Sequence, residues 1–200
     1  MKKFIVAIMM VAVATTAVAQ KVSKAASKQA KEFAKQGWLI TPGSLPLDQQ
    51  FERSYQMRNQ IDDMGYPKFI IAEANTPGNS YDAAKMQALD IAKTNLAGLI
   101  QTEVTSLVES SVGNKQLAPD DAESIAETVQ ASKSLIAQSI GRVIMLVECY
   151  KINKNKTTTV YVSIAYNQKM AMEAAKNVVR EELKKKGEDL HAQLDKLIAR

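Results

Sequence analysis

The feature that most constrains the fold is an apolar residue at every fourth position through the middle of the chain. Residues four apart lie on the same face of an α-helix, so this spacing predicts one long helix from Tyr81 to about Ser111. The stripe consists of Ala84, Ala88, Ala92, Leu96, Ile100 and Val104, widened by Leu89, Leu99, Leu107 and Val108. Because its first three members are alanines, that half of the helix can lie close against a sheet or another helix.

Three segments around this helix have the apolar, β-branched and aromatic content of strands. They are 68–75 (KFIIAEAN, followed by a predicted turn at TPGNS), 141–152, and 157–166, the last two joined by the polar NKNK. Alternate residues of 141–152 form two apolar sets, Val143, Met145, Val147 and Cys149 on one face and Ile144, Leu146 and Tyr150 on the other. We therefore expect this strand to be central and to pair with 157–166 as an antiparallel hairpin.

The remaining apolar periodicity predicts helices before and after these strands. They cover 21–37, 47–64, 119–138, 168–186 and 188–199. The end of the third, ASKSLIAQSI, equally suits an extended approach to the sheet. Four leucines in the last two helices are Leu183, Leu190, Leu194 and Leu197. They suit packing on the domain, which we favour, or a short coiled coil with a second chain.

This order of elements predicts the α+β class. We expect a small antiparallel sheet of about three strands, with helices on one face, packed against the long alanine-rich helix. Extra helices stand at the N- and C-terminal ends. We divide the 200 residues into a signal peptide (1–19), an N-terminal helical extension (20–66) and an α+β domain with C-terminal helices (67–200).

The first twenty residues have the three parts of a secretory signal. Two lysines precede an apolar run that begins at Phe4, and Ala17 and Ala19 supply the small residues that signal peptidase requires. The uncharged stretch from Phe4 to Ala19 has 16 residues, fewer than the roughly 20 needed to cross a bilayer. We predict cleavage after Ala19, with a retained anchor as the alternative, and a periplasmic or secreted protein that begins at Gln20.

Directly after this predicted cleavage site, five lysines repeat at intervals of three and four residues. They are Lys21, Lys24, Lys28, Lys31 and Lys35, and Val22, Ala26, Ala30 and Phe33 fall on the opposite side of the same predicted helix. Such a helix can dock by its apolar side and leave the lysines in water, which we favour. Alternatively, the lysine row contacts an anionic lipid surface.

The sequence gives little support for catalysis or for a bound cofactor. Cys149 is the only cysteine and lies in a strand-like run, where a buried thiol acts as a small apolar group. His191 is the only histidine, which excludes a multi-histidine metal site. The chain has neither a glycine-rich phosphate loop nor a G-x-S-x-G motif. We therefore expect a protein that is not an enzyme and has no cofactor and no metal, and the sequence identifies no small-molecule substrate.

The charge of the chain argues against nucleic acid as a partner. Without the two lysines of the signal, 24 basic residues face 21 acidic ones, a balance too mild for a nucleic-acid-binding protein. The charge is unevenly placed, because residues 70–140 have four basic and nine acidic side chains, whereas residues 141–200 have twelve and seven. These two parts can attract each other within one molecule or across a homo-oligomer interface.

The segment from about Lys68 to Tyr166 resembles a family of small bacterial envelope proteins, the LPP-type lipoproteins, which are related to the N-terminal domain of the flagellar assembly protein FlgT. The resemblance rests on the strand KFIIAEA, the helix AAKMQALDIAKTNLAGLIQTEV and the block SKSLIAQSIGRVIMLVECYKINKNKTTTVYVSIAY. It implies an exported envelope module and transfers no active-site residue. Where those lipoproteins have the acylated cysteine, this chain has Gln20, which argues against a lipid anchor.

These observations lead to one functional expectation and one alternative. We expect an exported, non-enzymatic module of the cell envelope that binds itself or another envelope protein. The alternative is a peripheral membrane protein that acts through the basic helix 21–35.

Overall fold

The computed structural model describes residues 22–114, 116–187 and 190–198, so the predicted signal peptide and Lys21 lie outside the described residues. Its strands are β1 (Leu39–Ile40), β2 (Phe69–Gly78), β3 (Ile144–Ile152) and β4 (Thr158–Asn167). Its helices are α1 (Lys24–Lys35), α2 (Leu47–Arg58), α3 (Tyr81–Gly113), α4 (Pro119–Ala131), α5 (Lys133–Ser139), α6 (Gln168–Lys185) and α7 (His191–Leu197). The α+β class and the long helix are confirmed.

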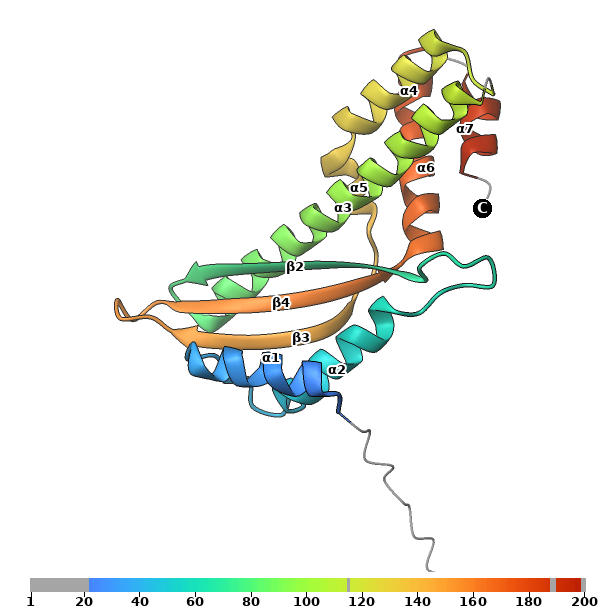
Figure 1. Cartoon of the computed structure of the whole chain (residues 1–200). Coiled ribbons are helices and arrows are strands. Elements are labelled where there is room, and N and C mark those ends of the chain that lie inside the picture. The colour runs from blue at the N-terminus through green and yellow to red at the C-terminus, as the bar shows by residue number, and fades with distance from the viewer. Residues whose placement is uncertain (1–21, 115, 188–189, 199–200) are drawn as a thin grey trace, which may run out of the picture.

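The four strands form one antiparallel sheet in the order β1-β3-β4-β2 (Figure 1). The fourth strand, which the sequence did not predict, is the two-residue β1, which pairs with Tyr150 and Cys149 at one edge of the sheet. β2 forms the other edge and continues through Gly78, so the turn predicted at TPGNS is shorter than expected. Thr76, Pro77 and Gly78 extend the pairing with β4 instead, and Pro77 is tolerated because edge strands accept proline.

The alanine stripe of α3 lies on β2 and β4, as the spacing predicted. Ala84, Ala88 and Ala92 are fully buried in a cluster that includes Val160 and Val162 of β4. The Ser80 side chain caps the helix by accepting a hydrogen bond from the Ala83 amide. The approach is close at the start of α3, since a Cβ atom at Gly78 would stand 2.7 Å from the Ala84 nitrogen. Small residues therefore fix the spacing between helix and sheet.

The opposite face of the sheet is also covered, so the expectation of helices on one face was wrong. α1 and α2 pack there through Ala26, Leu47 and Phe51, together with Trp38, which directly precedes β1 (Figure 1). They contact Val147 and Cys149 of β3 and Tyr161 and Ala165 of β4. The described part of the N-terminal segment 20–66 thus shares a core with the sheet, because β3 and β4 expose apolar side chains on both faces.

The simple alternation predicted for β3 was also wrong. The register with β4 shifts between Met145 and Val147, which is a β-bulge. The extra residue reverses the alternation, so side chains after the bulge point to the face opposite the one predicted. Ile144, Leu146, Val147 and Cys149 consequently pack on the α1–α2 side, whereas Val143, Met145 and Tyr150 pack on the α3 side. Glu148 also faces α3, where Lys85 meets it.

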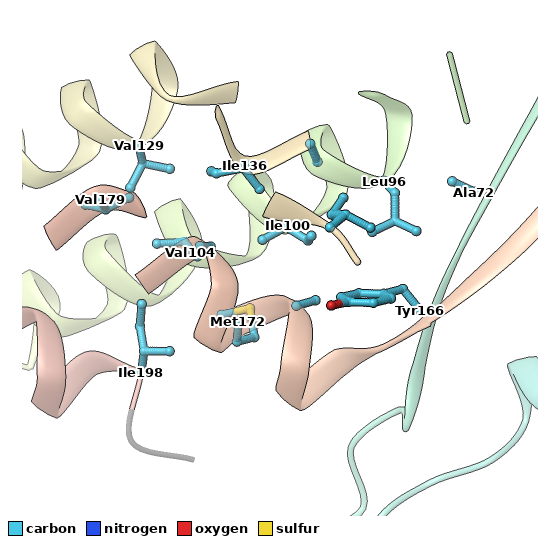
Figure 2. Packing of buried hydrophobic residues seen from close by; sticks show 14 of the residues in the cluster. Ala72, Leu96, Ile100, Val104, Val129, Ile136, Tyr166, Met172, Val179 and Ile198 are labelled. Atoms are coloured by element: carbon cyan, nitrogen blue, oxygen red, sulfur yellow. The ribbon is translucent and has the colours of Figure 1, made fainter. Parts of the chain in front are cut away.

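Beyond the sheet, the second half of α3 continues into a helical lobe with α4, α5, α6 and α7 (Figure 1). Figure 2 shows its packing, with Val129, Ile136 and Val179 turned toward Ile100 and Val104 of α3. The predicted helix 119–138 is two helices, because the chain breaks at Ser132 before α5, and ASKSLIAQSI is helical for most of its length. Leu183, Leu190 and Leu194 are buried in this core, which confirms packing on the domain.

Candidate functional site

The loop between α2 and β2 has a defined conformation, although the sequence predicted that α2 would continue to Met64. The Asp62 carboxylate accepts hydrogen bonds of 2.9 Å from the amides of Met64 and Tyr66, and the Asp62 amide donates to the Tyr66 carbonyl at 2.7 Å. Gly65 supplies the positive φ of +86° that the turn requires. The aspartate thus replaces helical hydrogen bonds with a local turn, which explains why α2 ends at Arg58.

This loop presents apolar side chains to solvent. Ile61 is 60% exposed, Met64 63% and Tyr66 42%, and Met170 in the first turn of α6 is 55% exposed. Isolated exposed apolar residues are common on protein surfaces, but a group of them on one ordered feature indicates a contact surface. We name residues 61–66 the apolar loop.

Beside the apolar loop lies a cleft of about 610 Å³. The loop and the two residues before β2, Pro67 and Lys68, form one wall, and the N-terminal half of α6 forms the other. The apolar part of the lining comprises Met64, Tyr66, Pro67, Leu107, Met172 and Ile198. Met172 and Ile198 also belong to the buried cluster in Figure 2, so the cleft opens onto the edge of the main core. Its volume is within the range of binding pockets, about 300 to 1,000 Å³.

Charged side chains of both signs surround this apolar lining. They are Asp62, Asp63, Glu103 and Glu173, and Lys68, Lys169 and Lys176. Glu103 accepts a hydrogen bond from Gln168, and Asp62 is used within the turn. Within the described parts of the chain, Asp63, Glu173 and the three lysines form no ion pair. They are therefore free to contact a charged partner.

A second hollow, of about 450 Å³, lies along the edge strand β2. Here Arg58 pairs with Glu73 at 3.1 Å, and the Asn95 side chain donates to the Glu73 carbonyl at 2.9 Å. Asn95 thus occupies one of the backbone acceptors that an edge strand would otherwise offer to another strand. This hollow is consequently a weaker candidate for a docking surface than the cleft.

Glu148 on β3 is a deeply placed charged group, since it is only 9% exposed. Lys85 of α3 contacts its carboxylate at 2.7 Å, and the Tyr81 hydroxyl donates to the same oxygen. Burial acts to lower the pKa of Lys85, but the hydrogen bond and charge of Glu148 outweigh it and the pKa is raised. Burial, followed by the hydrogen bond to Glu148, raises the pKa of Tyr81. These contacts tie the start of α3 to the sheet.

The residues singled out from the sequence are dispersed over the molecule. Lys24, Lys28, Lys31 and Lys35 are exposed along α1, and Lys21 lies outside the described residues. Cys149 is fully buried, and burial, followed by the charge of Glu148, raises its pKa to about 12, so the thiol is unreactive at neutral pH. His191 is the first residue of α7. Among residues 22–114, 116–187 and 190–198, no group of three or more His, Cys, Asp or Glu side chains could hold a metal ion.

The apolar loop was missed because the sequence was interpreted as a helix up to Met64. Asp62 followed by Gly65 was the available signal, since aspartate and glycine at this spacing favour a turn.

The chain matches no protein-family model, no curated protein and no solved structure. The resemblance to LPP-type envelope lipoproteins therefore stays a prediction. None of the helices within the described residues is both long enough and apolar enough to pass through a lipid bilayer.

Proposed function

We propose that this protein is an exported, non-enzymatic module of the cell envelope that binds a protein partner, itself or another envelope protein, through the apolar loop and the adjacent cleft. The signal-like N-terminus supports export. The observation that supports docking is that Ile61, Met64 and Tyr66 are exposed on one ordered turn, and that Met64 and Tyr66 border a cleft with an apolar lining.

The chemistry of this surface favours a protein segment as the partner. Met64 and Met172 give the cleft two flexible, polarizable side chains, which adapt to irregular apolar surfaces. Charges of both signs at its rim suit the mixed charge of a protein, whereas a polyanion such as nucleic acid would meet four carboxylates there.

A site-specific photo-crosslinker at position 64 tests the docking surface in cells that export the full-length chain. We expect a covalent adduct when benzoylphenylalanine replaces Met64. The matched control is the same replacement at Met86, which is 67% exposed on α3. Met86 lies roughly 25 Å along the helix from the part of α3 that lines the cleft, taking 1.5 Å per residue. The absence of any adduct at position 64 would contradict the proposal.

Binding to an anionic lipid surface through α1 is the second candidate function. Its support is that Lys24, Lys28, Lys31 and Lys35 are exposed and form no ion pair within the described residues. Against it, Ala26 is fully buried and Ala30 and Phe33 pack toward the sheet. Binding would therefore depend on charge alone, at about 1 kcal/mol per lysine near the membrane.

Sedimentation with phosphatidylglycerol vesicles tests this candidate. The bound fraction should fall when the four lysines are replaced by glutamine, and it should not fall when Lys154 and Lys156 of the β3–β4 turn are replaced. Equal binding of both variants would eliminate a role for α1.

A further inference from the structure

The shape of the docking surface indicates which protein would bind there, an inference that rests on the proposed function. We propose that the partner is a second copy of this chain. The two copies are related by a two-fold axis, and the apolar loop of each fills the cleft of the other.

The first argument is that a projection and a hollow of the same chemistry lie side by side. Ile61, Met64 and Tyr66 are exposed on the loop, and Met64 and Tyr66 also line the near wall of the hollow. Leu107, Met172 and Ile198 line the rest of it. The apolar loop cannot fold into its own cleft, because the hydrogen bonds of Asp62 and the pairing of Ile61 with Pro67 hold it as a wall. A two-fold interface requires one surface to be complementary to itself, and an adjacent projection and hollow meet that requirement.

The second argument is charge. The apolar loop has Asp62 and Asp63 and no basic residue. The rest of the rim has three lysines against two glutamates, and Lys169 and Lys176 stand on the α6 wall with no ion pair in the described residues. Inserting one copy's loop into the other's cleft brings Asp63 toward these lysines. A two-fold axis forms each of these contacts twice in the dimer, so even a modest attraction between Asp63 and the lysines contributes twice to the binding free energy.

A foreign partner of one charge sign fits this surface less well. An acidic segment would meet the aspartates of the loop, and a basic one would meet the lysines of α6. A second copy presents Asp63 opposite Lys169 and Lys176 and matches the apolar area at the same time. The second copy is therefore the partner that the arrangement of charges favours.

Charge reversal followed by mixing tests the dimer. One variant has Asp63→Lys, and the other has Lys169→Glu with Lys176→Glu. Asp63 and Lys169 are exposed and Lys176 is half-buried. Analytical ultracentrifugation of the wild-type protein should show a concentration-dependent dimer, and each variant alone should dimerise at least tenfold more weakly. An equimolar mixture should recover the dimer as a heterodimer, and so should one chain with all three substitutions. A matched control, Lys24→Glu with Lys28→Glu on α1, should dimerise as the wild type does.

Each outcome has a defined meaning. A wild-type protein that stays monomeric, or a mixture that fails to recover the dimer although both variants give the circular dichroism spectrum of the folded protein, would overturn the inference. The crosslinker at position 64 separates this failure from failure of the proposed function. An adduct of twice the chain mass supports the dimer. An adduct with a different protein alone refutes the dimer but leaves the docking function standing, and no adduct refutes both.

Discussion

The two faces of the sheet are covered in different ways. On one face, α3 lies on β2 and β4 through Ala84, Ala88 and Ala92, and this packing continues into the aliphatic core of the helical lobe. On the other face, α1 and α2 stand over an aromatic group. The Phe33 ring lies 4.9 Å from Phe51, 5.2 Å from Tyr161 and 5.7 Å from Trp38, measured between ring centroids.

The difference shows that helices can stabilise one sheet in two ways. On one face the α3 backbone lies close to the strands, and on the other face large aromatic side chains fill the space between the strands and α1 and α2. Alanines bring α3 close and leave no gap to fill, so added volume should be harmful there. Rings separate α1 and α2 from the strands, so removed volume should be harmful on that side. The two faces therefore predict opposite sensitivities to a change in side-chain size.

The largest effect is expected from removing a ring on the aromatic face. Phe51 is 2% exposed and contacts Phe33 edge to face. Phe51→Ala should lower the free energy of unfolding by about 3 to 5 kcal/mol, because it leaves a cavity that the strands cannot close. Urea denaturation measures the change. Phe51→Leu, which keeps most of the volume, is the matched control and should cost clearly less, and equal losses in the two variants would contradict the account.

A smaller loss is expected from adding volume on the alanine face. Ala88 is fully buried between α3 and the sheet. Ala88→Leu should destabilise the protein by about 1 to 3 kcal/mol, because a well-packed interface must shift to accept the extra atoms. Thermal unfolding gives the comparison with Ala83→Leu, an exposed position of the same helix that should be nearly neutral. A neutral Ala88→Leu variant would show that α3 does not lie against the sheet as closely as its alanines suggest.

The alanine face was predictable from the sequence because one periodicity specifies it. The spacing of Ala84, Ala88 and Ala92 indicated both the helix and its buried side, and the structure differs only by two residues at the C-terminal end. The aromatic face was less visible. Trp38 and Phe51 belong to segments far from β3 and β4 in sequence, and no local pattern states which strand they will cover.

Two of the errors share a physical origin, since a local irregularity in the backbone interrupted a regular periodicity in each case. The bulge at Met145 to Val147 changed which side chains of β3 face α3, and alternation alone cannot reveal one inserted residue. The turn built on Asp62 ended α2 early, and it formed the loop that became the candidate site. The cleft itself depends on Leu107, Met172 and Ile198, which meet only through tertiary packing. The fold class was therefore predictable, whereas the site was not.

The last and smallest effect concerns pH and involves only the aromatic face. The fully buried Cys149 faces Tyr161, and burial raises the pKa of the thiol from 9.0 to about 12. Between these values the folded protein keeps the proton while the unfolded chain loses it. Rising pH therefore favours the unfolded state, and the loss reaches about 1.4 kcal/mol near pH 10. The contribution of the thiol to stability should consequently be constant below about pH 8 and fall from pH 9 upward.

Chemical denaturation of the wild type and of Cys149→Ala across this range isolates the contribution of the thiol. Burial also raises the pKa of Tyr161, and the wild type and the variant share that group, so only their difference in slope reports on Cys149. Cys149→Ala should lose its stability with pH less steeply than the wild type, whatever its stability at neutral pH. Parallel curves for the two proteins would show that the thiol is open to solvent, and hence that α1 and α2 do not seal this face as the rings of Phe33 and Trp38 indicate.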